Sequence, residues 1–103
     1  MSYIISPPEE TALQAHLQKL RTQLHEDPEL SWQEHQTTRL VRRELEALCL
    51  EPVPRGLPTG TAALLRGALP GPTVGLRADL DALPITERTG AEFSSRVPGV
   101  MHA

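Results

Sequence analysis

Apolar positions recur at helical spacing near the start of the chain, on four leucines that share one face: Leu13, Leu17, Leu20 and Leu24. Ser6 precedes a proline and Glu9 follows three residues later, which predicts a capping box at the start of a helix. Pro28 disfavours helical geometry in the residue before it. The pattern therefore predicts one amphipathic helix that starts at Ser6 and ends at or before Asp27.

A second apolar stripe follows the short link DPELS, on Leu40, Val41, Leu45 and Leu48. Ser31 and Glu34, in the segment SWQE, repeat the capping-box spacing and predict that a second helix starts there. Trp32 lies at this start and is interpreted as an anchor in the core rather than as a binding platform. Because the link is short, the two helices should be adjacent in space.

The rest of the chain has the pattern of short strands and turns. Prolines at positions 52, 54 and 58 allow at most an edge strand over 51–55. The pattern predicts a short buried strand over 61–67 and a returning strand over 73–78. The segment ALPGP between them has the residues of a turn, so 61–78 would form a hairpin. A loop is expected over 79–84, and residues 86–103 show no clear period. This order predicts an α/β fold with a thin core for a chain of this length.

Composition then narrows the functional classes. The chain has 103 residues, with 10 Lys and Arg against 13 Asp and Glu and a net charge of -3, enough for one small domain. It has no basic patch with interleaved aromatic residues, so a nucleic-acid partner is not expected. No apolar run reaches the roughly 20 residues that span a bilayer, so no membrane partner is expected, and the N-terminus lacks the pattern of a secretory signal.

The single cysteine, Cys49, cannot form an internal disulfide, which favours a reducing, cytoplasmic setting. No adjacent base is evident, so Cys49 is interpreted as a small buried residue rather than as a nucleophile.

Two aspartates carry the first candidate chemistry. Asp79 and Asp81 follow the apolar segment 73–78 in the stretch RADLDALPI, and in extended chain their side chains would point the same way. Two carboxylates on one side can bind a hard cation, or one can orient a ligand while the other acts as acid or base. The alternative is that both accept backbone N–H groups in a turn, and spacing alone leaves the two interpretations open.

A D-x-D segment after an apolar strand is also found in phosphatases of the haloacid-dehalogenase type, in which the first aspartate is the nucleophile. Asp79 would take that role here. Leu83 stands where those enzymes have threonine or valine, and Arg77 interrupts the apolar run, so this interpretation is the weaker one.

Histidines supply the other candidates. His25 lies at the predicted end of the first helix, where the helix dipole favours it, and Glu29 across the turn is its expected partner. His102 follows the loop PGVM and is a candidate ligand or hydrogen-bond donor. His16 and His35 fall among polar helical residues and are expected to be solvated.

Four segments, LRTQLHEDPELSWQEHQTT (20–38), PTGTAALLRG (58–67), GPTVGLRADLDALPITERTG (71–90) and SRVPGVMHA (95–103), occur in an order that resembles one family. The chain resembles, over about residues 14–103, the N-terminal part of the dinuclear-metal amidohydrolases and metallopeptidases, which include hippurate hydrolases, N-acyl-amino-acid deacylases and auxin-conjugate hydrolases. The resemblance implies a catalytic α/β domain with a mixed sheet and an inserted lid or dimerisation domain. Residues 1–103 would form part of the catalytic domain, without the lid.

The resemblance also assigns individual residues. Asp81 matches an aspartate that sits beside the metals and orients a histidine ligand, while Asp79 occupies a position that does not bind metal in this branch. His102 matches the first histidine of MHACGHD, whose later cysteine and histidine are metal ligands. Two divalent ions (Zn, Mn, Co or Ni) would activate a water and polarise the acyl carbonyl, with a glutamate as general base.

Those ligands and the glutamate would lie beyond Ala103, so these 103 residues are expected to bind no metal and to be inactive alone. The implied substrate of the full-length enzyme is a small N-acyl amino acid, and a homodimer would require the lid domain. The alternative is a non-catalytic module that kept this scaffold and binds a partner through its uncovered sheet. The family often has glycine where Cys49 ends the second helix, so either that helix ends differently or Cys49 carries a strain of about 1 kcal/mol.

Overall fold

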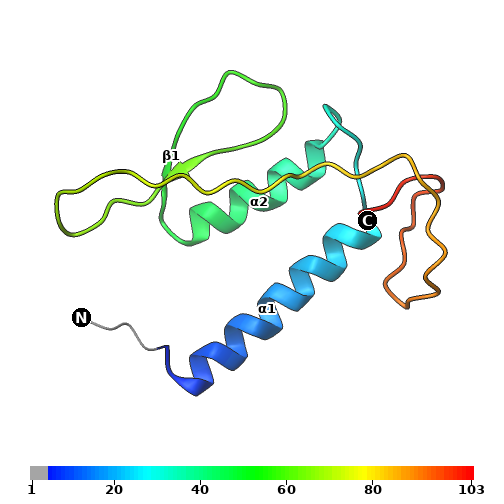
Figure 1. Ribbon diagram of the computed structural model, residues 1–103, viewed down its shortest axis with the longest axis horizontal. Helices are drawn as coiled ribbons and strands as arrows, with labels where there is room; N and C mark the ends of the chain where they lie inside the picture. The colour runs from blue at the N-terminus through cyan, green and yellow to red at the C-terminus, as the bar shows by residue number, and fades with distance from the viewer. Residues whose placement is uncertain (1–4) are drawn as a thin grey trace.

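The computed structural model describes residues 5–103 and has two helices followed by two short strands (Figure 1). The elements are α1 (Pro7–Glu26), α2 (His35–Ala47), β1 (Glu51–Pro52) and β2 (Ala63–Leu64). The molecule is flat, with extents of 48 × 38 × 20 Å. The α/β class and the order of helices before strands are confirmed.

The first helix begins and ends where the sequence predicts. Ser6 accepts a hydrogen bond from the Glu9 amide at 3.4 Å, and the Glu9 carboxylate accepts one from the Ser6 amide at 3.0 Å, which completes the capping box. The helix stops at Glu26, before Asp27 and Pro28. None of its residues is buried, and Leu13 and Leu17 on the apolar face are about half exposed.

The second helix is capped differently from the prediction, and the capping box at Ser31 is wrong. α2 begins at His35, and the Ser31 hydroxyl takes no part in its cap. Glu29 caps the helix instead, because its carboxylate oxygens accept hydrogen bonds from the amides of Gln36 at 3.1 Å and Thr37 at 2.6 Å. These are free amides of the first helical turn, and an anionic acceptor there is also favoured by the helix dipole.

Two residues expected in the core are exposed. Trp32 has a positive φ of 67°, lies in the turn before α2 and is 66% exposed, so the prediction of a core anchor is wrong. Leu48, at the end of the apolar stripe of α2, is also exposed, whereas Leu40, Val41 and Leu45 are half-buried. Within residues 5–103, the side chains of Trp32 and Leu48 therefore have little surface to pack against.

Cys49 ends α2 in the left-handed region, with φ of 57°. The Cys49 amide donates to the Glu46 carbonyl at 2.9 Å and the Leu50 amide to the Leu45 carbonyl at 3.2 Å, the two bonds of a Schellman motif. The chain thus keeps the glycine-type helix end with a side chain in place, in the conformation for which the sequence predicts a strain of about 1 kcal/mol. The prediction that Cys49 is buried is wrong, because the thiol is exposed.

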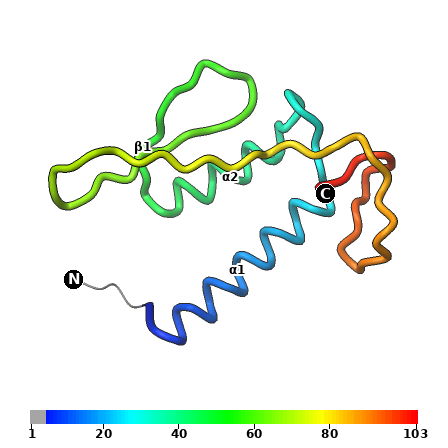
Figure 2. Tube along the Cα trace, in the orientation of Figure 1, coloured from blue at the N-terminus to red at the C-terminus, as the bar shows by residue number. Residues whose placement is uncertain are grey.

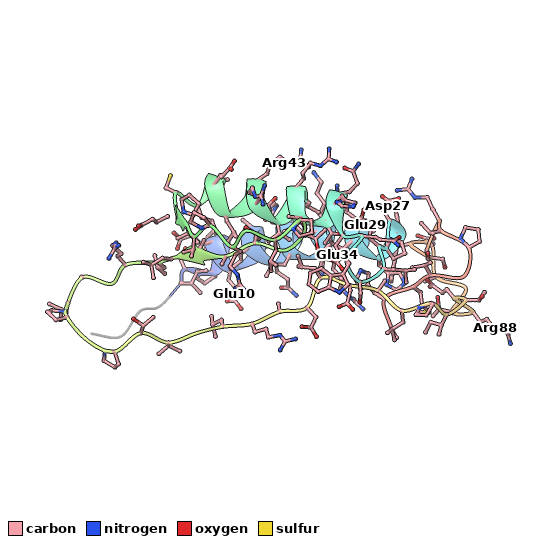
Figure 3. The ribbon with its side chains drawn as sticks, turned by 90° about the horizontal axis from the view of Figure 1, so that it is seen from above. Glu10, Asp27, Glu29, Glu34, Arg43 and Arg88 are labelled. Carbon is pink, nitrogen blue, oxygen red and sulfur yellow. The ribbon has the colours of Figure 1, made fainter. Side chains whose placement is uncertain are left out.

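The strands pair differently from the expected hairpin. β1 and β2 are antiparallel, with Glu51 opposite Leu64 and Pro52 opposite Ala63. The predicted hairpin over 61–78 is wrong, since residues 73–78 are extended but belong to no sheet among the described residues. This extended segment crosses α2 in the view of Figure 1, yet Figure 3 shows it running apart from the helices.

The small core lies where the loop before β2 meets the start of α2 and the loop after the extended segment. Its buried residues include Ala82, Glu34, Thr37, Thr38 and Thr59, so most of these side chains are polar. Thr38 accepts a hydrogen bond from the Gly60 amide at 2.9 Å and so ties α2 to the loop before β2. The predicted thin core is confirmed.

Candidate functional site

A shallow depression of about 300 Å³ lies between the link that joins the helices and the chain at 78–81. Its lining includes the carboxylates of Glu34, Asp79 and Asp81 and the hydroxyl of Ser31. Figure 3 shows Glu29 and Glu34 near the start of α2, and of these two Glu34 lines the depression. Both aspartates of RADLDALPI therefore face one hollow.

Asp81 is held against the helix link by its neighbours along the chain. The Ala82 amide donates to the Glu29 carbonyl at 2.7 Å, and Leu30 and Ala82 form a parallel bridge. Ala82 is 3% exposed, so this contact lies in the core. The Ser31 hydroxyl donates to Asp81 Oδ2 at 2.6 Å. The loop that carries Asp81 thus has fixed contacts on both sides of the carboxylate.

The charge of Asp81 is stabilised locally. The hydrogen bond from Ser31, together with one from its own backbone amide, lowers the pKa of the Asp81 carboxyl from its ordinary value. The Arg77 guanidinium acts in the same direction through its charge, and so does His102 when it is protonated. Asp81 is therefore an ionised acceptor at neutral pH.

Asp79 lies in a different environment from Asp81. Its carboxylate pairs with Arg77 at 3.1 Å, and both side chains are largely exposed. It does not follow a strand of a sheet in the described chain, which is the setting that the phosphatase interpretation requires. The two aspartates share the depression, but only Asp81 is anchored to the core.

His102 is brought toward Asp81 by the pairing of two loop segments. Leu83 and Met101 exchange hydrogen bonds at 2.9 and 3.0 Å, which places residues 81 and 102 on neighbouring strands of chain. The His102 Nε2 atom is buried and has no hydrogen-bond partner among the described residues. Burial, and then the charge of His25, lowers the pKa of His102, and the nearby Asp81 only partly opposes this. The imidazole is therefore held in its neutral form.

The expected pairing of His25 with Glu29 is wrong. His25 Nε2 instead contacts Glu87 Oε1 at 2.8 Å, and the Phe93 ring packs edge-on against the imidazole with centroids 5.6 Å apart. Glu87 also accepts hydrogen bonds from the Ser95 amide at 2.8 Å and from the Thr89 hydroxyl. Sequence reasoning missed Glu87 because it lies 62 residues from His25 in a stretch without period.

Glu87 organises the loop 86–97 and docks it on the end of α1. Arg96 completes the contact, since its amide donates to the Glu26 carbonyl at 2.8 Å and its guanidinium pairs with Glu26 and Asp27. Figure 2 shows the last part of the chain returning to this end of α1. The helix end therefore supports the loop that leads to His102.

The remaining histidines are peripheral. His16 contacts Glu44 at 2.8 Å across the two helices and is exposed, and His35 is exposed at the start of α2. The expectation that they lie at the surface is confirmed.

The family resemblance implies a centre that holds two metal ions. Within residues 5–103 no group of three or more His, Cys, Asp and Glu side chains is arranged to hold a metal ion. Asp81 and His102 are two donors, whereas a bound metal in a protein typically takes three or four protein ligands.

Comparisons with known proteins agree on one class. A search against family models finds no match. Thermostable carboxypeptidase 1 of Saccharolobus solfataricus is 50% identical over 86 residues, which cover 82% of this chain and 22% of the relative. The N-acetylcysteine deacetylase of Bacillus subtilis is 48% identical over 94 residues, which cover 89% of this chain and 24% of the relative.

A solved structure carries the same fold. The crystal structure of a Bacillus subtilis protein, described as a dinuclear metal binding peptidase of the M20 family, superimposes with a TM-score of 0.85 at 45% identity. The match covers 89% of this chain and 26% of that one.

The chain is similar over more than four fifths of its length to hydrolases that include carboxypeptidases and N-acyl-amino-acid deacetylases, and the family resemblance drawn from its motifs is confirmed. More particularly, it matches the M20 family and spans about a quarter of the length of the relatives that it resembles. No helix in the described residues has the length and apolarity needed to cross a membrane.

Proposed function

We propose that these residues form part of the catalytic domain of a metal-dependent amidohydrolase that cleaves the amide bond of small N-acyl amino acids. The observation that supports the proposal is the anchored, ionised carboxylate of Asp81, which lies on a depression in a chain that is 48% identical to an N-acetylcysteine deacetylase. Asp81 would orient a histidine ligand of the metal centre, and His102 would lie beside it as a neutral imidazole.

The two divalent ions, of Zn, Mn, Co or Ni, and most of their ligands would come from the other three quarters of the enzyme. The exposed apolar residues of α1 and of 73–78 would pack against that remainder, including Leu13, Leu17, Val74 and Leu76. The lid domain would make any homodimer. The exposed, single Cys49 fits a reducing cytoplasmic setting.

A chimeric enzyme tests the proposal. The 103 residues replace the matching segment of the Bacillus subtilis N-acetylcysteine deacetylase, and hydrolysis of N-acetyl-L-cysteine is measured with metal added. We expect an active enzyme in which Asp81→Asn lowers kcat/KM about 100-fold, as for other residues that orient metal ligands. Glu10→Gln is the control, since it also removes a carboxylate charge, at an exposed residue in the first turn of α1, and should change kcat/KM less than about threefold.

The outcomes separate the two classes of function. A folded chimera that binds metal but hydrolyses nothing would favour the non-catalytic module. An active chimera in which Asp81→Asn and Glu10→Gln behave alike would remove Asp81 from the catalytic site.

A further inference from the structure

The hydroxyl of Ser31 is not needed to cap α2. The residue has the sequence context of a helix cap, but Glu29 already satisfies the amides of Gln36 and Thr37 at the start of α2. The Ser31 hydroxyl instead points to the loop that carries Asp81 and donates to Oδ2 at 2.6 Å. A hydroxyl-to-carboxylate bond of this length is charge-assisted and stronger than a neutral hydrogen bond.

The geometry around this bond is fixed from both ends. On one side, the Glu29 carboxylate is bound to α2 and the Glu29 carbonyl accepts from the Ala82 amide. On the other, the Gln33 amide donates to the Leu30 carbonyl at 2.9 Å and closes the turn that holds Ser31. The hydroxyl and the carboxylate are therefore presented to each other by backbone contacts that do not depend on their own hydrogen bond.

We propose that Ser31 is a positioning residue for Asp81: its hydroxyl selects the rotamer in which the other carboxylate oxygen, Oδ1, is directed at a partner in the catalytic site. This inference rests on the proposed function, because Asp81 acts there as an orienting carboxylate. A carboxylate without this bond keeps its charge but samples several directions, and misplacement by about 1 Å can cost 100-fold in rate.

Other charged groups bear on Asp81 and must be held constant in any test. Arg77, and His102 when it is protonated, stabilise its negative charge. Two further acidic residues, Glu34 and Asp79, line the same depression. A substitution at Ser31 changes none of these four charged residues, so its effect on Asp81 can be attributed to the lost hydroxyl.

The test uses two variants of nearly equal shape in the active chimera. Ser31→Thr keeps a hydroxyl at Cβ, whereas Ser31→Val replaces that hydroxyl with a methyl group. We expect Ser31→Val to lower kcat/KM for N-acetyl-L-cysteine about tenfold, the lower end for outer partners of a metal site, and Ser31→Thr to restore most of the loss. Thr11→Val is the matched control, because it makes the same hydroxyl-to-methyl change at an exposed residue of α1, whose hydroxyl donates to the Pro7 carbonyl at 3.0 Å.

A second readout does not depend on turnover. The pKa of the Asp81 carboxyl is followed through its ¹³C shift, in protein labelled at aspartate and assigned with Asp81→Asn. We expect this pKa to rise in Ser31→Val and to stay low in Ser31→Thr. A purely structural role of Ser31 would change stability without this difference between the two variants.

Each result decides one question. If the chimera is active and Ser31→Val matches Ser31→Thr in both kcat/KM and the Asp81 pKa, the inference is wrong while the proposed function stands. If the chimera is inactive with metal added, the proposed function fails and Ser31 has no catalytic carboxylate to position.

Discussion

Two regions of this flat molecule differ in how far they bury their apolar side chains. At the anchored end, defined as residues 25–31 with 79–102, Ala82 is 3% exposed and is surrounded by backbone hydrogen bonds. In the extended segment, 73–78, Leu76 is 98% exposed although its sequence pattern is that of a strand. An apolar side chain is buried here only where another segment packs against it, and an apolar sequence pattern does not by itself supply that segment.

Polar side chains explain why the anchored end is ordered without a large core. Glu29 caps α2, and the Glu87 carboxylate accepts a hydrogen bond from the Ser95 amide within the loop 86–97. The Arg96 guanidinium pairs with two acids at the end of α1. The extended segment has one ion pair, Arg77 with Asp79, which is exposed and contributes little. The comparison predicts that substitutions will have large effects at the anchored end and small effects in the extended segment.

The largest effect on stability is expected from overpacking the anchored end. Ala82→Leu adds three carbon atoms beside the Glu29 carbonyl and should destabilise this region by about 1–3 kcal/mol. Ala78→Leu makes the same change at an exposed position of the extended segment and should alter the free energy by less than about 0.5 kcal/mol. Amide hydrogen exchange at Ala82 and Leu83 measures both, and equal effects would show that the two regions do not differ.

The next effect is a loss of loop docking in acid. Hydrogen bonds from Thr89, then Ser95 and His25, lower the pKa of Glu87 from 4.5 to about 2. The folded state therefore binds the proton less tightly than the unfolded state, so the stabilisation is complete above about pH 4.5 and is lost as the pH falls toward 2. We expect protection of the Ser95 amide to fall in that window.

The control for the acid effect is Glu87→Gln, which keeps the shape of the side chain but has no carboxyl to protonate. Protection of the Ser95 amide should then be lower at neutral pH and insensitive to pH between about 4.5 and 2. If protection of the Ser95 amide still falls in acid in this variant, the protonation of a group other than Glu87 causes the loss.

The smallest effect is expected at the end of α2, outside both regions. Cys49→Gly should stabilise the chain by about 0.5–1 kcal/mol, because glycine adopts the left-handed conformation without the cost of a side chain. Cys49→Ala keeps a Cβ atom and should leave the unfolding free energy nearly unchanged. Denaturant unfolding measures the difference, and a Cys49→Gly variant that is no more stable than Cys49→Ala would mean that the φ of 57° carries no strain.

Local signals in the sequence predict local structure well. Ser6 and Glu9 form the expected capping box, Pro28 follows the end of α1, and the missing glycine at Cys49 marks a left-handed helix end. Each of these depends on contacts within a few residues. The family resemblance also emerges from sequence, because its motifs are long and lie in order.

Contacts between distant segments explain the errors. Ser31 has the spacing of a cap, but Asp81, 50 residues away, takes its hydroxyl. His25 meets Glu87 rather than Glu29, and no periodicity marks that pair. The hairpin over 61–78 fails for a related reason, since β2 pairs backward with β1 and leaves 73–78 without a neighbouring strand in the described chain. Propensity cannot choose among partners that only the tertiary fold brings together.

Trp32 has a practical consequence for spectroscopy. It is the one tryptophan of the chain, it is 66% exposed, and it lies on the rim of the depression beside Ser31. Its fluorescence should therefore be that of a hydrated indole, with emission at long wavelength and easy quenching by small solutes. Anything that fills the depression or covers this face would shift that emission, so the chain contains its own optical probe of occupancy, without an added label.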